Sequence, residues 1–317
     1  MRLPGLKAVT IVAVLTTACG SSDRPASPTE PTPQTSQPPP APPTIPSGLS
    51  PTLTSMLDGL SQYIGQALTQ SQGDLPRNPQ NRTQIEAKIA MLQNPSLAAD
   101  IINGRRWVES QASSMNGRTV PFVLVFALES MRNEATDAIH TLEPVLPIIE
   151  RFYDVPLSTA AIRVWYGFVI GNTGGGGAIY TEDRTTYDAR TGPTRLLPYD
   201  AIWAHELGHS WMGHEGLNQF IELYGYNLVR TGSTNPSEWT FTRNWTPNLA
   251  TNEGVAALLD IYQLIGHDAM QRAYRAIYPL HPPYGTSPSP AVIQAFLSAV
   301  PPALQAPVSA KLAKVTF

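Results

Sequence analysis

Apolar residues recur at helical spacing in several segments of the chain, and these segments predict most of its structure. Leu49–Leu68 and Thr83–Arg106 are typical of helices, and so is Thr136–Tyr153, although two internal prolines predict that this third helix is interrupted. Thr119–Leu128 is apolar throughout, and its pattern fits a strand and a buried helix equally well.

The order of the remaining segments predicts an α+β fold that is mostly helical. Two strands follow the third helix, and then come a helix around residue 205, a helical run from Val255 to Leu264 and a proline-rich end. We therefore expect a small antiparallel or mixed sheet beside helices. Residues 48–317 suffice for one large domain or two small ones, and we expect a helical part at 48–134 and a second domain at 135–317.

The first 19 residues are predicted to be an export signal. Arg2 and Lys7 precede a short apolar segment, Ala8–Thr17, which is too short to cross a bilayer. Leu15–Cys19 resembles a bacterial lipobox, with Thr16 where leucine is preferred, and Cys19 is the only cysteine in the chain. We expect a lipid anchor to a membrane at Cys19; the alternative is an ordinary cleaved signal with an incidental cysteine.

Composition adds a linker and excludes a nucleic-acid partner. Residues 20–47 contain ten prolines among Ser, Thr and Gln, which predicts an extended, disordered stalk. The residue after Cys19 is Gly rather than Asp, so in a diderm cell we expect the outer membrane rather than the inner one. The net charge is −3 and no cluster of Lys and Arg is present, so nucleic acid is not an expected partner.

The candidate chemistry lies in the sequence His205-Glu206-Leu207-Gly208-His209, which has the form H-E-x-x-H. Residues four apart on a helix lie on one face, so both imidazoles can bind one metal ion while Glu206 takes a proton from a metal-bound water. Asp200 is a suitable N-cap for this helix and Gly213 can end it. The alternative is an amphipathic helix with two incidental histidines.

A catalytic zinc needs a third protein ligand. His214 follows His209 by five residues, but the metzincin pattern requires histidine one position later, where the chain has Glu215. Glu253 is the better candidate because it opens the apolar helical run and would lie on a rigid element; the alternative for it is a solvated carboxylate at a helix start. The other glutamates considered, in less regular surroundings, are Glu215, Glu222 and Glu238.

Together these motifs resemble the gluzincin peptidases, in particular the catalytic domain of the aminopeptidase N type, over roughly residues 135–265. That family carries H-E-x-x-H-x-W-x-G and a downstream N-E-G-[FHY]-A, which here read His205–Gly213 and Asn252-Glu253-Gly254-Val255-Ala256. The resemblance implies one zinc ion bound by His205, His209 and Glu253, with Glu206 as general base. It also implies a strand in Ala161–Ile170 and an edge strand that begins at Ile179 and precedes the zinc helix.

Further residues follow from the same resemblance. Asp260 lies two helical turns after Glu253 and is a candidate to hold a ligand histidine by its second ring nitrogen. Tyr278 and Tyr284 are candidates for stabilising the oxyanion, as are Tyr274 and His281; the alternative for each is a packing role in the core or on the surface. The predicted activity is hydrolysis of peptide bonds in a peptide or protein substrate at the bacterial cell envelope or outside the cell. The alternative is an envelope lipoprotein that binds zinc or peptides without cutting them.

The chain departs from the family in three places. Between the second histidine and Glu253 there are 43 residues, many more than is usual in the family, and we interpret Glu215–Trp245 as an insertion near the site. The Gly-Ala-Met-Glu-Asn signature that binds a free amino group is missing; Gly174–Gly177 occupies its region and predicts a turn between two strands. The resemblance would place the transition-state tyrosine beyond Tyr284. Cleavage within a chain and cleavage from its end therefore both stay open.

Overall fold

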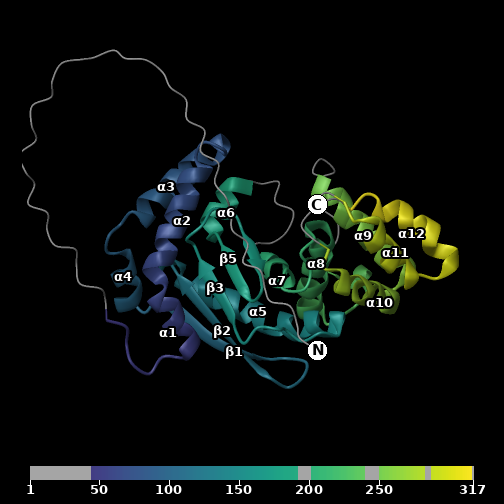
Figure 1. The fold of residues 1–317 in the computed structure, drawn as a ribbon, viewed down its shortest axis with the longest axis horizontal. Coiled ribbons are helices and arrows are strands. Elements are labelled where there is room, and N and C mark those ends of the chain that lie inside the picture. Colours follow the sequence, from purple (N-terminus) through teal and green to yellow (C-terminus); the bar gives the residue numbers. More distant parts are fainter. Residues whose placement is uncertain (1–43, 192–200, 240–249, 283–286, 316–317) are drawn as a thin grey trace, which may run out of the picture. The chain divides into compact units, whose positions relative to one another are not determined.

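Among the residues that a computed structural model describes (44–191, 201–239, 250–282 and 287–315), five strands form one mixed sheet (Figure 1). Their order across the sheet is β1-β2-β3-β5-β4. Strand β3 pairs in parallel with β2 and β5, whereas β1 and β4 are antiparallel strands at the two edges. The strands are β1 (Trp107–Ser113), β2 (Thr119–Phe126), β3 (Ile162–Tyr166), β4 (Thr173–Gly175) and β5 (Ala178–Thr181). A small mixed sheet beside many helices confirms the predicted α+β class.

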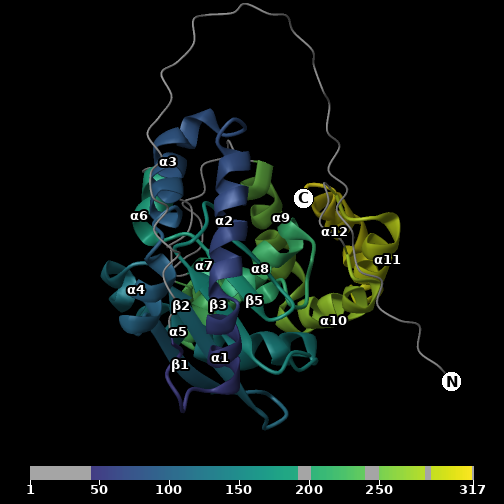
Figure 2. The same ribbon diagram turned by 60° about the vertical axis from the view of Figure 1, so that its left-hand side comes forward.

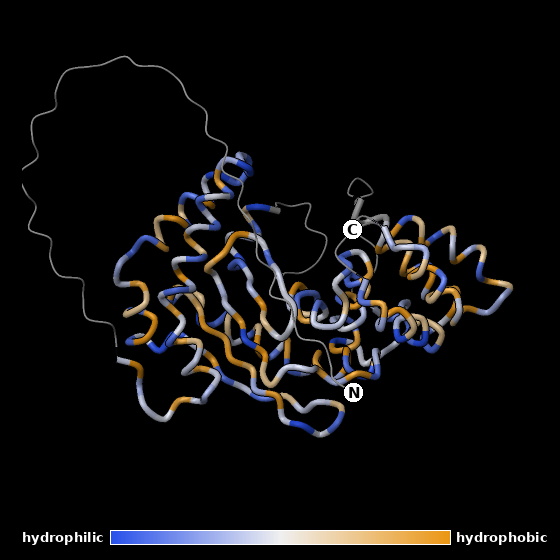
Figure 3. The backbone as a smooth tube through the Cα atoms, in the orientation of Figure 1, coloured by the Kyte–Doolittle hydropathy of each residue, from blue (hydrophilic) through white to orange (hydrophobic). Residues whose placement is uncertain are grey.

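The two N-terminal segments predicted as helical each form a pair of helices. These are α1 (Pro51–Asp58) with α2 (Leu60–Asp74), and α3 (Arg82–Leu92) with α4 (Leu97–Asn103). The Ser50 hydroxyl accepts a hydrogen bond from the Leu53 amide at 3.1 Å and so caps α1, which begins with proline as helices favour. The apolar segment from Thr119 is strand β2, along which hydrophobic residues concentrate (Figure 3).

Helix α5 (Arg132–Tyr153) is continuous, so the predicted interruption at its prolines is wrong. Pro144 has no amide hydrogen, so the backbone carbonyl of His140, one turn earlier, loses its helical hydrogen bond. Both residues are exposed, so water can reach this carbonyl. The rest of the helix packs a long apolar face into the core, and this burial outweighs the loss of hydrogen bonds at the prolines. The buried apolar residues of this face are Ala135, Ala138, Ile139, Leu142, Val145, Leu146, Ile148, Ile149, Phe152 and Tyr153.

Seven further helices follow β5 in the described part of the chain. They are α6 (Arg184–Thr191), α7 (Ala201–Gly208), α8 (Glu215–Thr231), α9 (Ala250–Ile265), α10 (His267–Ile277), α11 (Pro290–Ser298) and α12 (Gln305–Leu312). The segment interpreted as an insertion contains α8, most of which is buried against α7 and α5. Its Phe220 ring lies 6.0 Å from that of Phe152 and 5.6 Å from that of Tyr274, so α8 is a core element rather than a surface addition.

The two faces of the sheet carry different helices (Figure 2). Trp165, Tyr180 and Thr173 are paired across β3, β5 and β4, so their side chains share one face. The Tyr63 ring of α2 stacks on Trp165 at 4.1 Å, which places α2 on this face. Gly174 belongs to the opposite face and lies against the backbone of α7. Strand β4, and not β5 as the resemblance implied, is the edge strand beside α7.

Residues 48–134, predicted as a helical N-terminal part, supply β1 and β2 to the same sheet as β3. The sheet therefore contains strands from both sides of the domain boundary predicted at residue 134. Residues Pro42–Phe317 form one compact unit. No helix within the described residues has both the length and the apolar character needed to cross a membrane. The predicted signal, Cys19 and the proline-rich linker up to residue 43 lie outside the described residues.

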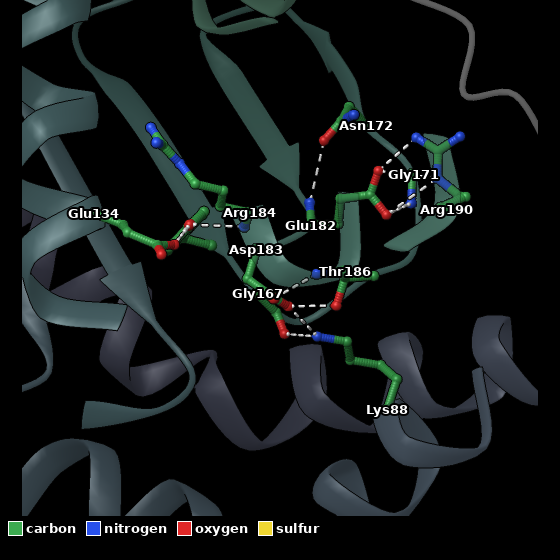
Figure 4. A network of polar contacts seen from close by, with 11 residues as sticks. Lys88, Glu134, Gly167, Gly171, Asn172, Glu182, Asp183, Arg184, Thr186 and Arg190 are labelled. Carbon is green, nitrogen blue, oxygen red and sulfur yellow. Dashed lines mark hydrogen bonds and ion pairs between the residues drawn. The ribbon is translucent and has the colours of Figure 1, made fainter. Parts of the chain in front are cut away.

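A buried ion pair joins α3 to the end of the sheet (Figure 4). The Lys88 ammonium donates to an Asp183 carboxylate oxygen at 3.0 Å and to the Gly167 carbonyl at 2.5 Å, with Lys88 only 5% exposed. Burial alone would raise the pKa of Asp183, but the charge of Lys88 and the hydrogen bonds from Thr186 outweigh burial and lower it. Asp183 also begins α6, since its carboxylate accepts from the Thr186 amide at 2.9 Å.

We expect Lys88→Met to lower the free energy of unfolding by about 3–5 kcal/mol at neutral pH, because it leaves a buried carboxylate without its cation. A depressed pKa contributes stability above the unfolded value of roughly 4, and this contribution disappears as the pH falls through the folded pKa. The difference between wild type and variant should therefore shrink below about pH 4. Urea denaturation from pH 3 to 8 measures it, with Lys88→Met/Asp183→Asn as the control that should recover part of the loss; a pH-independent difference would contradict the ion-pair account.

Candidate metal centre

Helix α7 and the turn after it bring two imidazoles together. Every residue of α7 is buried, and His209 follows its last residue with a backbone hydrogen bond to His205 at 3.3 Å. The Nε2 atoms of His205 and His209 lie 3.1 Å apart, with the two rings almost perpendicular at 88°. The spacing of four residues thus places both nitrogens at one point, as the sequence predicted.

The second nitrogen of each imidazole lies close to an oxygen atom. His209 Nδ1 lies 2.9 Å from the Met212 carbonyl oxygen, at hydrogen-bond geometry. His205 Nδ1 lies 3.1 Å from a Glu222 carboxylate oxygen, which is an ion-pair distance without the geometry of a hydrogen bond. When His209 donates from Nδ1, the lone pair on its Nε2 faces the point where the two rings meet, as in metal-binding histidines.

Glu215, the first residue of α8, faces both histidines. Its two carboxylate oxygens lie 3.0 Å from His205 Nε2 and 3.2 Å from His209 Nε2. Ligand atoms of His205, His209 and Glu215 all lie within 4.8 Å of one another, close enough to hold one metal ion. Helix α8 begins here because His214 is its N-cap, with Nδ1 accepting from the Leu217 amide at 3.3 Å.

Glu206 lies beside this group in the wall of the same pocket. Its side chain is buried, and Oε2 has no hydrogen-bond partner among the described residues. Burial raises the pKa of Glu206 to about 7, despite the opposing attraction of the two histidines. A carboxylate with a pKa near neutrality is suited both to accept and to return a proton.

The electrostatics of the site favour a cation at the meeting point. Burial opposes a charge on His205, yet Glu215 and Glu222 outweigh it and raise the pKa of this imidazole well above its usual range. Burial raises the pKa of Glu222, whereas the contacts with both histidines outweigh burial at Glu215 and lower its pKa. Three carboxylates therefore surround two imidazoles, and several of these groups hold a proton more tightly than usual. A divalent cation bound between them can replace these protons.

The pocket that contains these groups has a volume of about 390 Å³ and is also lined by edge strand β4. β4 and β5 form a hairpin in which Gly176 and Gly177, at φ of 55° and 74°, make the two-residue turn. The turn predicted for Gly174–Gly177 is therefore confined to its last two residues, and Gly174 and Gly175 belong to β4. The Gly177 amide donates to the Ser210 hydroxyl at 3.3 Å, which attaches the hairpin to the turn that carries His209.

Gly174 is required where the hairpin crosses α7, because a Cβ built at this position would overlap the carbonyl oxygen of Glu206. We expect Gly174→Ala to destabilise the protein by about 1–3 kcal/mol, as overpacking in a core does, and to displace the backbone of Glu206. Gly65→Ala is the control, because Gly65 is an exposed residue of α2 and a Cβ there would meet nothing within 4 Å. This substitution should be neutral or stabilising. Thermal unfolding measures both, and equal stability of the two variants would contradict the steric account.

The structure places the other predicted site residues as follows. Glu253 lies on α9, but its side chain is outside the described residues, as are Tyr284 and Cys19. Asp260 accepts from the Lys311 ammonium at 2.8 Å, and the carboxylate found at His205 Nδ1 belongs to Glu222. Tyr278 packs on the Tyr153 ring at 5.8 Å. Glu182 is buried and paired with Arg190 at 2.5 Å (Figure 4).

Glu215 and Glu222, which the sequence offered only as weaker ligand candidates, lie beside the two histidines. They are seven residues apart, or two turns, on α8, so they share the face that packs on α7. The signal was available in the amphipathic pattern of Glu215–Thr231, which predicts a helix directly after the H-E-x-x-H motif. It was missed because this segment was interpreted as an irregular insertion.

We expect Glu222→Gln to weaken metal binding by roughly 10–100-fold, because the carboxylate 3.1 Å from His205 Nδ1 becomes a neutral amide. Asp260→Asn should leave metal binding unchanged, since Asp260 pairs with Lys311. Competition with a chromogenic chelator measures both affinities in folded protein, verified by circular dichroism. A larger loss in Asp260→Asn than in Glu222→Gln would restore the role predicted for Asp260.

Comparison with known proteins found no matching family model and no matching curated protein. Among solved structures, the chain is similar to aminopeptidase A of Legionella pneumophila in complex with aspartic acid, at 14% sequence identity and a TM-score of 0.45. The aligned part covers 66% of this chain and 28% of the aminopeptidase, so the chain matches less than a third of that protein. The functional conclusion therefore rests on the site itself.

Proposed function

We propose that this chain is a zinc-dependent peptidase in which Glu206 is the general base. One observation carries the proposal: two histidine Nε2 atoms and the Glu215 carboxylate converge beside a buried glutamate that has no hydrogen-bond partner among the described residues. A structural pair of histidines would not require both Nε2 atoms to face one carboxylate.

The donor set fits zinc. Two imidazole nitrogens and one carboxylate oxygen are the ligands of many catalytic zinc sites, which keep a fourth position for water. His205, His209 and Glu215 would hold the ion, and Glu222 and the Met212 carbonyl would fix the orientation of the two rings. A bound zinc ion supplies Lewis acidity, which lowers the pKa of a coordinated water to roughly 7 and polarises a carbonyl group.

Glu206 performs the proton transfers. The carboxylate accepts a proton from the attacking water and returns it to the departing amine. Tyr278 and Tyr284 remain our candidates for donating a hydrogen bond to the oxyanion, on the resemblance alone.

Edge strand β4 supports a peptide as substrate. It is the last strand of the sheet, and Thr173 and Gly174 line the pocket beside His205 and Glu206. An extended peptide can add to such an edge through main-chain hydrogen bonds, which would carry its backbone past the metal ligands. A small-molecule substrate would have no use for this edge.

We further propose that the protein acts at the bacterial cell envelope, attached through a lipid on Cys19 and separated from the membrane by the proline-rich segment 20–47. The lipobox-like sequence Leu15–Cys19 and the composition of the linker support this proposal. Labelling of cells with a fatty-acid analogue, for wild type and Cys19→Ala, tests the anchor.

The test of the activity is the zinc content of the purified protein together with its cleavage of a mixture of peptides, identified by mass spectrometry. One zinc ion per chain and cleavage that a chelator abolishes and zinc restores are the expected results. Zinc without cleavage of any peptide would favour the alternative of a metal-binding envelope lipoprotein. No zinc in the folded protein would overturn the metal centre.

A further inference from the structure

A second cavity adjoins the metal pocket across residues Asn172 and Thr173, which line both. Its volume is about 320 Å³, enough for a large side chain. One wall is helix α2, from which Tyr63, Gln66 and Gln70 face the cavity, and another is Tyr180 of β5. These three α2 residues are spaced by three and four positions, so they form one face of the helix.

The lining of this cavity is uncharged and combines two aromatic rings, Tyr63 and Tyr180, with the aliphatic side chains of Ala67, Val169 and Ile170. The Tyr63 and Tyr180 rings lie 5.7 Å apart at an interplanar angle of 31°, and the Tyr63 ring also contacts Trp165 at 4.1 Å and Phe168 at 5.3 Å. The remaining polar groups are side-chain amides and one hydroxyl, and none of the residues that line the cavity carries a charge. Aromatic walls with amides at the rim favour a flat, neutral side chain.

The position of the cavity relative to the metal site follows from the pleat of the sheet. Thr173 and Tyr180 share the face covered by α2, whereas Gly174 belongs to the face covered by α7, which carries His205 and Glu206. Side chains of an extended peptide paired with β4 alternate between these two faces. A residue whose side chain enters the second cavity is thus a close neighbour of the backbone that passes the metal ligands.

We propose that this second cavity, between α2 and the β4–β5 hairpin, is a specificity subsite that takes a neutral aromatic side chain of the substrate, Phe or Tyr. The inference rests on the proposed peptidase function and adds the class of residue that is selected. A Lys or Glu side chain would lose water there and find no opposite charge, so it should be rejected by at least roughly tenfold.

Binding can be measured without turnover in full-length Glu206→Gln protein loaded with zinc. The probes are capped peptides of alanine with one central Phe, Tyr, Lys or Glu, and an all-alanine peptide. Calorimetry should show the Phe and Tyr peptides bound at least roughly tenfold more tightly than the other three. Gln70→Arg adds a cation at the exposed rim and should improve the Glu peptide relative to the Phe peptide by a similar factor.

Gln72→Arg is the matched control, because Gln72 is exposed on the same helix and does not line the cavity; it should leave the preference unchanged. Equal affinity for all five peptides, or no binding of any, would overturn the subsite. So would the same shift in both arginine variants, which would be a long-range effect of charge. Cleavage by wild type is read separately: an aromatic preference in binding without cleavage leaves the subsite intact and refutes the peptidase.

Discussion

Glu206→Gln is expected to lower the turnover number by roughly 10²–10⁴-fold, the contribution typical of a general base. Glutamine has nearly the same shape as glutamate, so the buried side chain leaves no cavity. Its amide can neither accept the proton of the attacking water nor return it to the leaving amine. The change removes the chemistry of one carboxylate and retains the three groups that would bind zinc, since Glu206 is not one of them.

Three measurements separate this result from a general loss of structure. Zinc content should stay at one per chain, the thermal unfolding temperature should not fall, and binding of a non-cleaved peptide should persist. Burial raises the pKa of Glu206, which means that the fold disfavours its charge, so a neutral amide should be tolerated or stabilising. Unchanged turnover in a zinc-loaded Glu206→Gln protein would exclude Glu206 as the base and would redirect attention to Glu215.

Much of the site could be predicted because its parts are local in sequence. The H-E-x-x-H spacing alone places His205 and His209 on one helical face, and four consecutive glycines predict a turn. The fold class also followed from local periodicity. Such features depend on neighbours within about one or two helical turns, and sequence records them directly.

What could not be predicted depends on tertiary packing. Pro144 breaks isolated helices, but α5 stays continuous because its apolar face is buried. Strand β4 contains two glycines in three residues, which is a poor strand sequence, and it exists because Gly174 allows close approach to α7. Glu215 and Glu222 lie next to His205 because of the way α8 packs on α7. The spacing of residues within the H-E-x-x-H motif does not specify this packing.

The second large effect concerns which residue is the third ligand of the zinc ion. We expect Glu215→Ala to weaken zinc binding by more than roughly 100-fold. This is a larger loss than removal of a residue that only orients a ligand causes. The geometry supports this residue, because its carboxylate already contacts both Nε2 atoms. The resemblance to gluzincins supports Glu253 instead, on the sequence Asn252–Ala256. The two hypotheses predict opposite results for Glu215→Ala and Glu253→Ala, each of which is the matched control of the other.

Zinc affinity is measured by competition with a chelator, and stabilisation by zinc gives a readout that does not depend on activity. A ligand at a hundredfold excess over its dissociation constant stabilises the folded state by about 2.7 kcal/mol, so wild type should unfold at a higher temperature when zinc is added. Glu215→Ala should lose this response and Glu253→Ala should keep it.

The reverse pattern would make Glu253 the ligand and leave Glu215 as an acidic neighbour, whereas loss in both would indicate that the two carboxylates share the ion. Because His205 and His209 are common to every outcome, His209→Ala, which should abolish the response entirely, fixes the lower limit against which both glutamate variants are judged.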